Sequence, residues 1–96
     1  MKTKALTVYQ VSVSWIDTAQ DFETDHYYVA GNNLFANKGE AEKLADLEFE
    51  NVLELAKDYT NNFLEIDKKY RSIEYENHRG DTANIQVCIE PFIVKF

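Results

Sequence analysis

Apolar and polar positions alternate in two segments near the start of the chain. Between residues 5 and 16 the alternation is clearest, with apolar side chains at Tyr9, Val11, Val13 and Trp15. A period of two is typical of a half-buried strand. Residues 26–30 are rich in β-forming side chains, and the turn signal at residues 31–33, Gly-Asn-Asn, ends that strand. Residues 17–25 have no such period and are rich in acids, so we expect an exposed loop joining the strands of a hairpin.

A capping signal at Asn37 predicts one long amphipathic helix. Glu40 follows three residues later, so the Asn37 side chain can accept from an early helical N–H while Glu40 reaches back. The predicted helix begins at Asn37 and runs to about residue 59, with residue 65 as its outer limit. At about 100° per residue, its apolar stripe contains Ala41, Ala45, Val52, Leu55, Ala56, Tyr59 and Phe63.

Alternation returns after the helix and predicts two further strands. Residues 70–77 place Arg71, Ile73 and Tyr75 on one face, and a turn at residues 78–82 follows. Residues 83–96 form the last predicted strand, with apolar side chains at the odd positions from Ala83 to Ile89. We expect the register of this strand to break at Pro91, which has no backbone N–H.

The element order ββαββ predicts an α+β fold in a single domain over residues 1–96. Hairpin connections on both sides of the helix favour a four-stranded, mostly antiparallel sheet with the long amphipathic helix on one face. The opposite face then carries Leu6, Val8 and Tyr28, while Leu47 and Leu53 lie away from the main helical stripe. Surplus apolar surface of this kind marks a partner-binding or self-association face.

The composition indicates a folded, acidic protein. Hydrophobic residues make up 45% and aromatic residues 14% of the 96 residues, which excludes a disordered chain despite a net charge of -7. That charge opposes attraction to nucleic-acid phosphates and anionic lipid, so we expect no direct nucleic-acid or membrane partner. The lone Cys88 cannot form an internal disulfide, and no apolar run is long enough for a signal peptide or membrane span. We therefore expect a cytoplasmic protein.

No motif in the chain predicts catalysis. Neither His26 nor His78 has a second histidine or a cysteine at metal-ligand spacing, and Cys88 has no CxxC partner. The three glycines are too scattered to form a phosphate-binding loop. We therefore predict that the chain is not an enzyme and that it binds no cofactor and no metal.

Two smaller features have ordinary structural interpretations. The tripeptide at residues 79–81, Arg-Gly-Asp, matches an integrin-binding signal, but in a predicted hairpin tip its glycine and aspartate are typical turn residues. Glu48 falls within the apolar stripe of the helix, where a carboxylate is costly unless paired. Arg71, Lys69 or water at the sheet edge could pair with it, and a position at the rim is favoured over a functional acid.

The predicted helix carries a row of acidic residues on its solvent side. They recur with a spacing of four along its solvent side, at Asp46, Glu50, Glu54 and Asp58. Lys43 and Lys57 offset this repulsion only in part. One interpretation is a solubilising face, and the other is a surface that meets a basic partner. Because one charge per ~6 Å of helix is sparse beside one per ~1.7 Å of duplex DNA, the second interpretation also needs the loop acids Asp17, Asp21, Glu23 and Asp25.

The small size, acidity and ββαββ order, together with the lack of an enzyme motif, resemble small inhibitors that phages and mobile elements encode against host defence, anti-CRISPR proteins among them. The resemblance covers the general layout of residues 5–96 and involves no diagnostic motif, so it assigns no functional residue. It implies stoichiometric binding to a host protein, often by occluding a nucleic-acid site on a basic target.

Three hypotheses about function follow. In the first, the chain is a non-catalytic protein-binding module that uses the acidic helix face and the first loop to block the basic surface of a host protein. In the alternative, it is a structural or regulatory homo-oligomer, such as a homodimer through the exposed sheet face, and the acids serve only solubility. The third is an enzyme that uses Glu48 with His26 or His78, which requires these groups to converge in one pocket.

Overall fold

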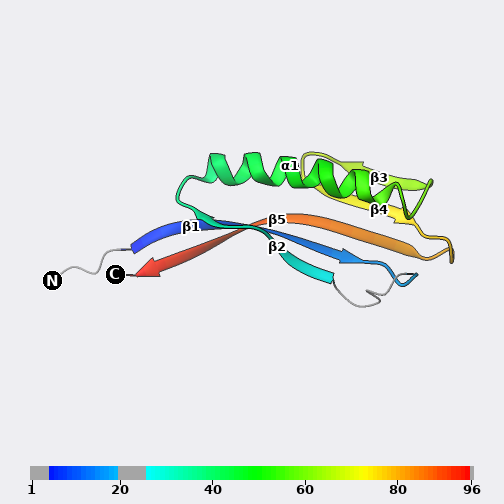
Figure 1. Cartoon of the computed structure of the whole chain (residues 1–96), viewed down its shortest axis with the longest axis horizontal. Coiled ribbons are helices and arrows are strands. Elements are labelled where there is room, and N and C mark those ends of the chain that lie inside the picture. Colours follow the sequence, from blue (N-terminus) through cyan, green and yellow to red (C-terminus); the bar gives the residue numbers. More distant parts are fainter. Residues whose placement is uncertain (1–4, 20–25, 96) are drawn as a thin grey trace.

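The computed structural model describes residues 5–19 and 26–95, with side chains except at residues 26–28 and 30–33. These residues form an α+β fold in which one helix lies against a five-stranded antiparallel sheet (Figure 1). Along the chain the elements are β1 (Ala5–Ile16), β2 (His26–Phe35), α1 (Lys38–Ala56), β3 (Phe63–Asp67), β4 (Ser72–Glu76) and β5 (Thr82–Lys95). The strand order in the sheet is β2-β1-β5-β4-β3.

The predicted four-stranded ββαββ order is wrong by one strand, because the chain forms β3 soon after the helix. The predicted start of α1 is confirmed, since the Asn37 side chain accepts from the backbone N–H of Gly39 at 2.7 Å. Its end comes earlier than expected, at Ala56. The Thr60 hydroxyl then accepts from the N–H of Asn62 at 2.9 Å and donates to the carbonyl of Glu76 at 2.6 Å. These bonds tie the turn after the helix to β4 and start β3 beside it.

The predicted β1–β2 hairpin is confirmed, but β2 does not end at residue 30. Val11 pairs with Ala30 and Tyr9 pairs with Phe35, so four residues of β2 lie opposite Gln10 alone. The Gly-Asn-Asn segment therefore forms a bulge, after which the strand resumes.

The predicted register break at Pro91 is wrong. β1 and β5 pair continuously from Ala5 with Lys95 to Ile16 with Asn84. The N–H of Val87 bonds to the carbonyl of Arg71, so odd-numbered residues of β5 direct their N–H groups away from β1. Pro91 is odd-numbered and lies beyond the last residue of β5 that pairs with β4, which is Gln86. Its missing N–H therefore faces an open edge and removes no bond from the sheet.

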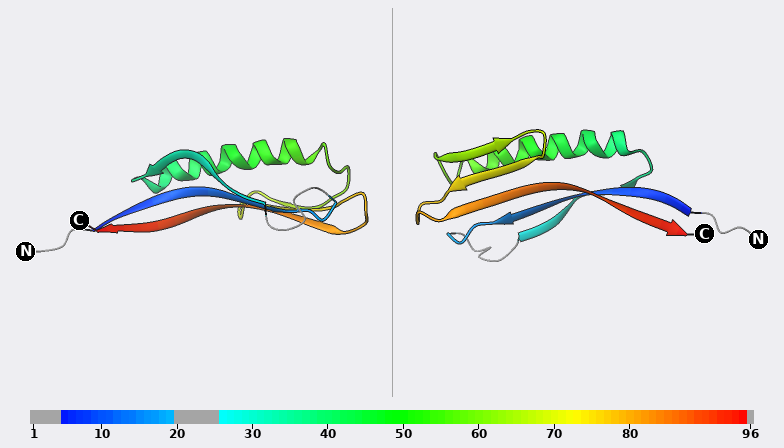
Figure 2. Two further views of the ribbon diagram at one scale, coloured as in Figure 1. Left: turned by 60° about the horizontal axis from the view of Figure 1, so that its bottom comes forward. Right: turned by 180° about the vertical axis from the view of Figure 1, so that it is seen from behind.

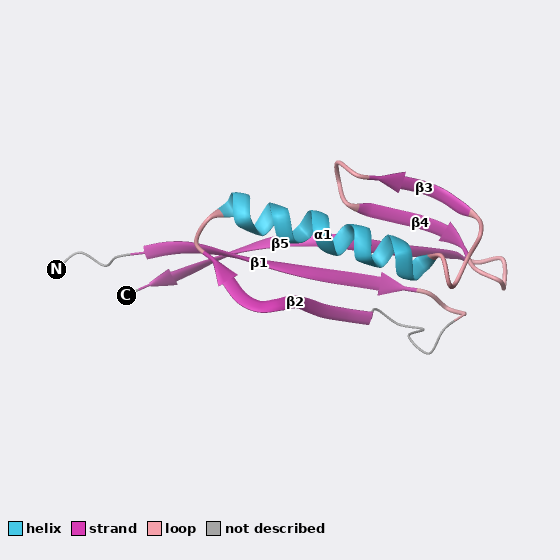
Figure 3. Cartoon of the chain, turned by 45° about the horizontal axis from the view of Figure 1, so that its top comes forward, coloured by secondary structure: helices cyan, strands magenta, loops and turns pink. Residues whose placement is uncertain are grey.

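The helix α1 lies over β1, β5 and β2 (Figure 3), and the hydrophobic core lies between the helix and the sheet. The buried helical side chains have spacings of four, four, three and four, at Ala41, Ala45, Phe49, Val52 and Ala56. The predicted stripe missed Phe49 and wrongly included Leu55, which is 51% exposed because it is rotated about 100° from Ala56. Tyr59 and Phe63 pack at the margin of the core from positions beyond the helix.

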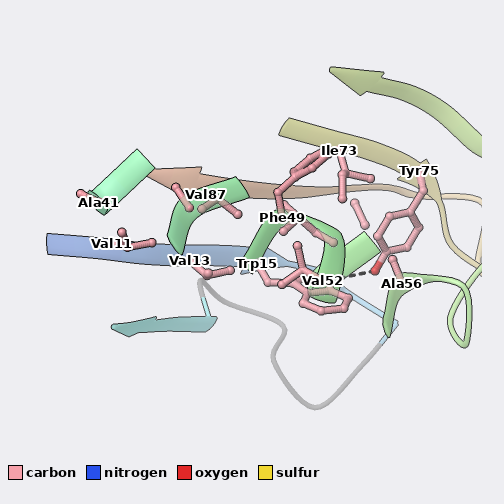
Figure 4. Close-up of a cluster of buried hydrophobic side chains, with 13 residues drawn as sticks. Val11, Val13, Trp15, Ala41, Phe49, Val52, Ala56, Ile73, Tyr75 and Val87 are labelled. Carbon is pink, nitrogen blue, oxygen red and sulfur yellow. Dashed lines mark hydrogen bonds between the residues drawn. The ribbon is translucent and has the colours of Figure 1, made fainter. Parts of the chain in front are cut away.

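The sheet contributes the odd-numbered side chains of β1, β4 and β5 to this core. Figure 4 shows several of them around Phe49 and Val52, and together they are Val11, Val13, Trp15, Ile73, Tyr75, Ala83, Ile85 and Val87. The alternation that predicted the strands therefore also identified the side that faces the helix, although Val8 and Ser12, at even positions of β1, are buried as well. The even-numbered residues of these strands face away from the helix.

One end of the sheet extends beyond the helix as a two-stranded ribbon, residues 5–8 of β1 and 92–95 of β5 (Figures 1 and 2). In the described part of the chain these residues pair only with each other, since β2 pairing begins at Tyr9. The molecule measures 59 × 23 × 18 Å, and its radius of gyration is 15.8 Å, against about 13 Å for a compact domain of this length. The fold is elongated because of this ribbon.

Candidate functional surfaces

The loop acid Asp17 is buried, so its predicted place on an exposed surface is wrong. Its carboxylate accepts from the Tyr75 hydroxyl, from Asn77 Nδ2 at 2.9 Å and from the N–H of Ala19 at 2.9 Å. Trp15 Nε1 in turn donates to the Tyr75 hydroxyl at 2.9 Å (Figure 4). The cluster joins the end of β1 to the end of β4.

The Asp17 cluster serves the fold. Burial by itself raises the pKa of Asp17, but the hydrogen bonds from Tyr75, Ala19 and Asn77 outweigh it and hold that pKa below its ordinary value. Burial and the neighbouring Asp17 carboxylate raise the pKa of Tyr75. Within the described residues no buried side-chain polar atom lacks a partner. Three hydrogen bonds from the chain itself hold the buried Asp17 carboxylate, so the cluster has a structural role.

The turn at residues 77–81 confirms the structural interpretation of the Arg-Gly-Asp tripeptide. Gly80 has a φ of 84°, a left-handed conformation that favours glycine. Arg79 Nη1 donates to the carbonyl of Thr18 at 2.7 Å, and the Thr18 hydroxyl donates to Asp81 Oδ2 at 3.0 Å. Both charged side chains of the tripeptide therefore bond back to the loop after β1.

A cavity of about 760 Å³ lies beside this turn, lined by residues 57–62 and 76–80. Its lining includes cations, Lys57 and Arg79, as well as the acids Asp58 and Glu76, so it does not select one sign of ligand charge. His78 lines this cavity and Glu48 does not. The side chain of His26 lies outside the described residues. Among the residues described, no group of three or more His, Cys, Asp or Glu side chains could hold a metal ion.

Cations of the same chain accompany three of the four predicted helix acids. The pairs are Asp46 with Arg71 at 2.8 Å, Glu50 with Lys68 at 4.0 Å and Glu54 with Lys57 at 3.0 Å. The fourth acid, Asp58, is exposed in the turn after the helix. Lys57 is therefore confirmed as a neighbour that offsets Glu54. Arg71 pairs with Asp46, and Glu48 is half-buried. The turn between β3 and β4 supplies the other two cations.

Of the four first-loop acids, Asp17 is the one that the structure describes, and it does not share an exposed surface with the helix acids. Asp17 is buried beneath Tyr75 and Asn77. The predicted partner-binding residues Asp21, Glu23 and Asp25 lie outside the described residues. The dense acidic field that the sequence hypothesis required therefore remains a prediction.

A second acidic surface lies on the open face, which we define as the even-numbered positions of β1, β4 and β5 together with Glu65 and Asp67 of β3. Register places Glu65 directly across from Glu74, and Glu76 follows two residues later on β4. Glu90 accepts from the Ser12 hydroxyl at 3.2 Å. Among the described strand positions, this face carries no Lys or Arg.

The sequence could have revealed part of this second acidic surface. Glu74, Glu76 and Glu90 occupy alternate positions to Ile73, Tyr75 and Ile89, so period-two alternation already placed them opposite the core. Glu65 was not recognisable, because β3 was not predicted. The neighbouring Cys88 is half-buried on the same face, where burial and the Glu90 carboxylate raise the pKa of its thiol. A raised pKa keeps this thiol protonated and unreactive near neutral pH.

An apolar patch adjoins these acids at the ribbon end of the open face. A hollow of about 430 Å³ there is lined by Val8, Gln10, Leu34, Phe92 and Val94. The prediction that Leu6 and Val8 lie opposite the helix is confirmed: Leu6 is 42% exposed and pairs with Val94, while Val8 is nearly buried and pairs with Phe92. The side chain of Tyr28, also predicted on this face, lies outside those described.

Comparisons with known proteins identify no relative. No protein-family model matches the chain, and neither a curated protein nor a solved structure matches it. No helix of the described residues is both long enough and apolar enough to cross a membrane. The assignment of function therefore depends on the surfaces described above.

Proposed function

We propose that the chain is a non-catalytic protein-binding module whose open face meets a basic surface of another protein. In this proposal the chain is an inhibitor that a phage or mobile element encodes. It acts by stoichiometric binding that occludes the nucleic-acid-binding surface of a host protein. The observation that carries the proposal is the lack of any Lys or Arg at the described positions of the open face, beside Glu65, Glu74 and Glu76.

The arrangement of these acids favours a cationic partner. Directly opposed residues of an antiparallel pair have Cβ atoms about 5 Å apart, and like charges there are destabilising. Glu65 and Glu74 form such a pair, and Glu76 lies about 7 Å further along the strand. Lys or Arg side chains of a partner would relieve this repulsion. The helix acids gain less from a partner, because Arg71, Lys68 and Lys57 already lie beside them.

A pair of charge-matched variants tests the proposal. The open-face variant carries Glu65→Gln, Glu74→Gln and Glu76→Gln, and the helix variant carries Asp46→Asn, Glu50→Gln and Glu54→Gln. Each removes three negative charges, so the two have equal net charge and differ only in which face is neutralised. Immobilised wild type and both variants are used to capture proteins from a lysate of the native host, followed by mass spectrometry.

We expect wild type and the helix variant to retain the same captured protein at low salt and the open-face variant to lose it. Capture should weaken as salt rises, because electrostatic steering is screened. Loss of capture in the helix variant alone would move the binding surface to the helix. Equal capture by all three proteins would contradict an electrostatic interface altogether.

A further inference from the structure

We infer that the apolar hollow at the ribbon is an anchor site for a large apolar side chain of the same basic partner, which lies along the open face as an extended segment. This inference rests on the proposed function. It adds a second, uncharged determinant of recognition and predicts the spacing between the two determinants on the partner.

The hollow is formed by three strands. Val8 and Phe92 are cross-strand partners, Val94 lies two residues beyond Phe92, and Leu34 enters from the β2 bulge. Val8 is nearly buried, whereas Leu34 is 52% and Phe92 44% exposed, so a buried floor lies between accessible walls. Its volume of about 430 Å³ lies within the ~300–1,000 Å³ of pockets that hold small organic groups.

The ribbon favours an occupant that approaches its face. An isolated two-stranded ribbon is marginally stable in water and is stabilised by packing against its apolar side. Its large apolar side chains lie mainly on the open face, and Ile93 is the exception on the other. Pro91 occupies the free edge of β5, where it lacks the N–H that an added strand would need. Addition of a strand at this edge is therefore disfavoured.

The acidic residues of the open face favour a basic partner over a second copy of the chain as the occupant of the hollow. Glu90 lies two residues from Phe92 on the open face, and Glu74 and Glu65 lie further along it. A second copy packed face to face would bring further carboxylates against Glu65 and Glu74, and the described open-face positions hold no Lys or Arg to offset that pair. A segment with an apolar side chain followed by Lys or Arg complements both parts of the face.

Strand register predicts the spacing of that segment. Glu74 pairs with Asn84, which is eight residues from Phe92 along β5. At ~3.3 Å per residue this separation is about 26 Å. β1 and β5 twist about each other over this length (Figure 1), and an extended chain can follow a twisted strand surface. The partner should therefore carry its basic residues about eight extended positions from its apolar anchor.

A designed peptide pair tests the anchor separately from the charge. The first probe is an acetylated, fluorescein-labelled peptide with tryptophan, a seven-residue glycine-serine spacer and four lysines. The second replaces the tryptophan with glycine. Fluorescence anisotropy measures both against the full chain at low salt and at about 0.3 M salt, where charge contacts are screened. The protein variants are Phe92→Ser and Leu34→Ser, with Ile93→Ser as the control on the opposite face of the ribbon.

We expect the tryptophan peptide to bind roughly tenfold more tightly than the glycine peptide. Phe92→Ser and Leu34→Ser should each bring this ratio close to one, while Ile93→Ser should leave it unchanged. Phe92 and Leu34 lie on different strands, so a folding defect in one variant leaves the other as a test. Circular dichroism of each variant would detect such a defect. The Glu65, Glu74 and Glu76 triple variant should weaken both peptides and preserve their ratio.

Other results would overturn the inference in distinguishable ways. Equal binding of both peptides to wild type, with weakening in the open-face triple variant, would reject the anchor and leave the proposed function in place. Binding of neither peptide at low salt would reject both. Concentration-dependent self-association of wild type in sedimentation velocity, abolished by Phe92→Ser, would identify a second copy as the occupant instead of a basic segment.

Discussion

The solvent face of α1 and the open face of the sheet are both acidic, but they differ in their counter-ions. Arg71, Lys68 and Lys57 lie within 4.0 Å of helix carboxylates. On the open face, the described strand positions hold Glu65, Glu74 and Glu76 with no Lys or Arg among them. A count of acids along the chain therefore pointed to the helix, whereas the distribution of cations in space points to the sheet. Uncompensated charge indicates a binding surface better than charge alone.

The two sides of the sheet also differ in how far their apolar side chains are buried. On the covered side, buried side chains from β1, β4 and β5 share one cluster with Phe49 and Val52 of the helix. On the open side, Phe92 and Leu34 at the ribbon remain about half exposed, and Ile16 and Val29 are 40% exposed further along the same face. The covered side should carry most of the stability, and the open side should tolerate change. Five substitutions test these two contrasts.

The largest effect should come from Phe49→Ala in the core. Phe49 is 3% exposed, and truncation of such a side chain costs about 3–5 kcal/mol of unfolding free energy. Phe92→Ala, the same change on the open face, should cost less than about 1.5 kcal/mol because its ring is already 44% exposed. Urea denaturation followed by circular dichroism measures both, and similar losses would contradict the contrast.

Asp17→Asn should have the next largest effect, about 2–3 kcal/mol, because an amide cannot accept all the hydrogen bonds that the carboxylate accepts. The folded-state pKa of Asp17 lies below its ordinary value. Its contribution is therefore fully present above about pH 4 and is lost as the pH falls through the folded-state pKa. The Asp17→Asn variant should show a flatter loss of stability on acidification than wild type, and Asp46→Asn serves as an exposed control. Parallel pH profiles for wild type and Asp17→Asn would reject the linkage.

A smaller effect is expected for Asp46→Asn, which removes the partner of Arg71. Asp46 is well exposed, and exposed ion pairs contribute about 0.2–1 kcal/mol. The variant should therefore lose a few tenths of a kcal/mol at low salt, as measured by thermal unfolding, and the loss should shrink in high salt. A gain in stability would show that the helix acids are not compensated.

The smallest effect, and the opposite sign, is expected for Glu74→Gln on the open face. Removal of one charge from the Glu65–Glu74 pair relieves repulsion and should raise stability by about 0.2–0.5 kcal/mol at low salt. Thermal unfolding of this variant beside Asp46→Asn compares the two faces directly. Destabilisation by Glu74→Gln would indicate that the open face has a favourable interaction that its charges do not explain.

The sequence predicted well wherever a local pattern determined the structure. Asn37 caps the helix as expected, and the odd positions of β1, β4 and β5 face the core. It failed where neighbours across the sheet decided the outcome. Phe63 joins β3 because Thr60 and Asn62 bond to the end of β4, and the glycine-asparagine turn signal becomes a bulge within β2.

The candidate surface was only partly accessible from the sequence for the same reason. Leu6 and Val8 could be assigned to the open face by alternation, but Leu34 joins them through a bulge and Phe92 through the β1–β5 register. The position of Arg71 beside Asp46 depends on how the β3–β4 turn lies against the helix. That contact links residues 25 positions apart, and no local pattern encodes it.

By itself, the sequence determined the α+β class, the start of the helix and the faces of its longest strands, because capping and periodicity are properties of neighbouring residues. The tertiary structure decided the fifth strand, the burial of Asp17 and the distribution of counter-ions, because each depends on side chains brought together from distant positions. The acidic helix face that the sequence favoured is therefore largely compensated, and the open face is the better candidate for binding.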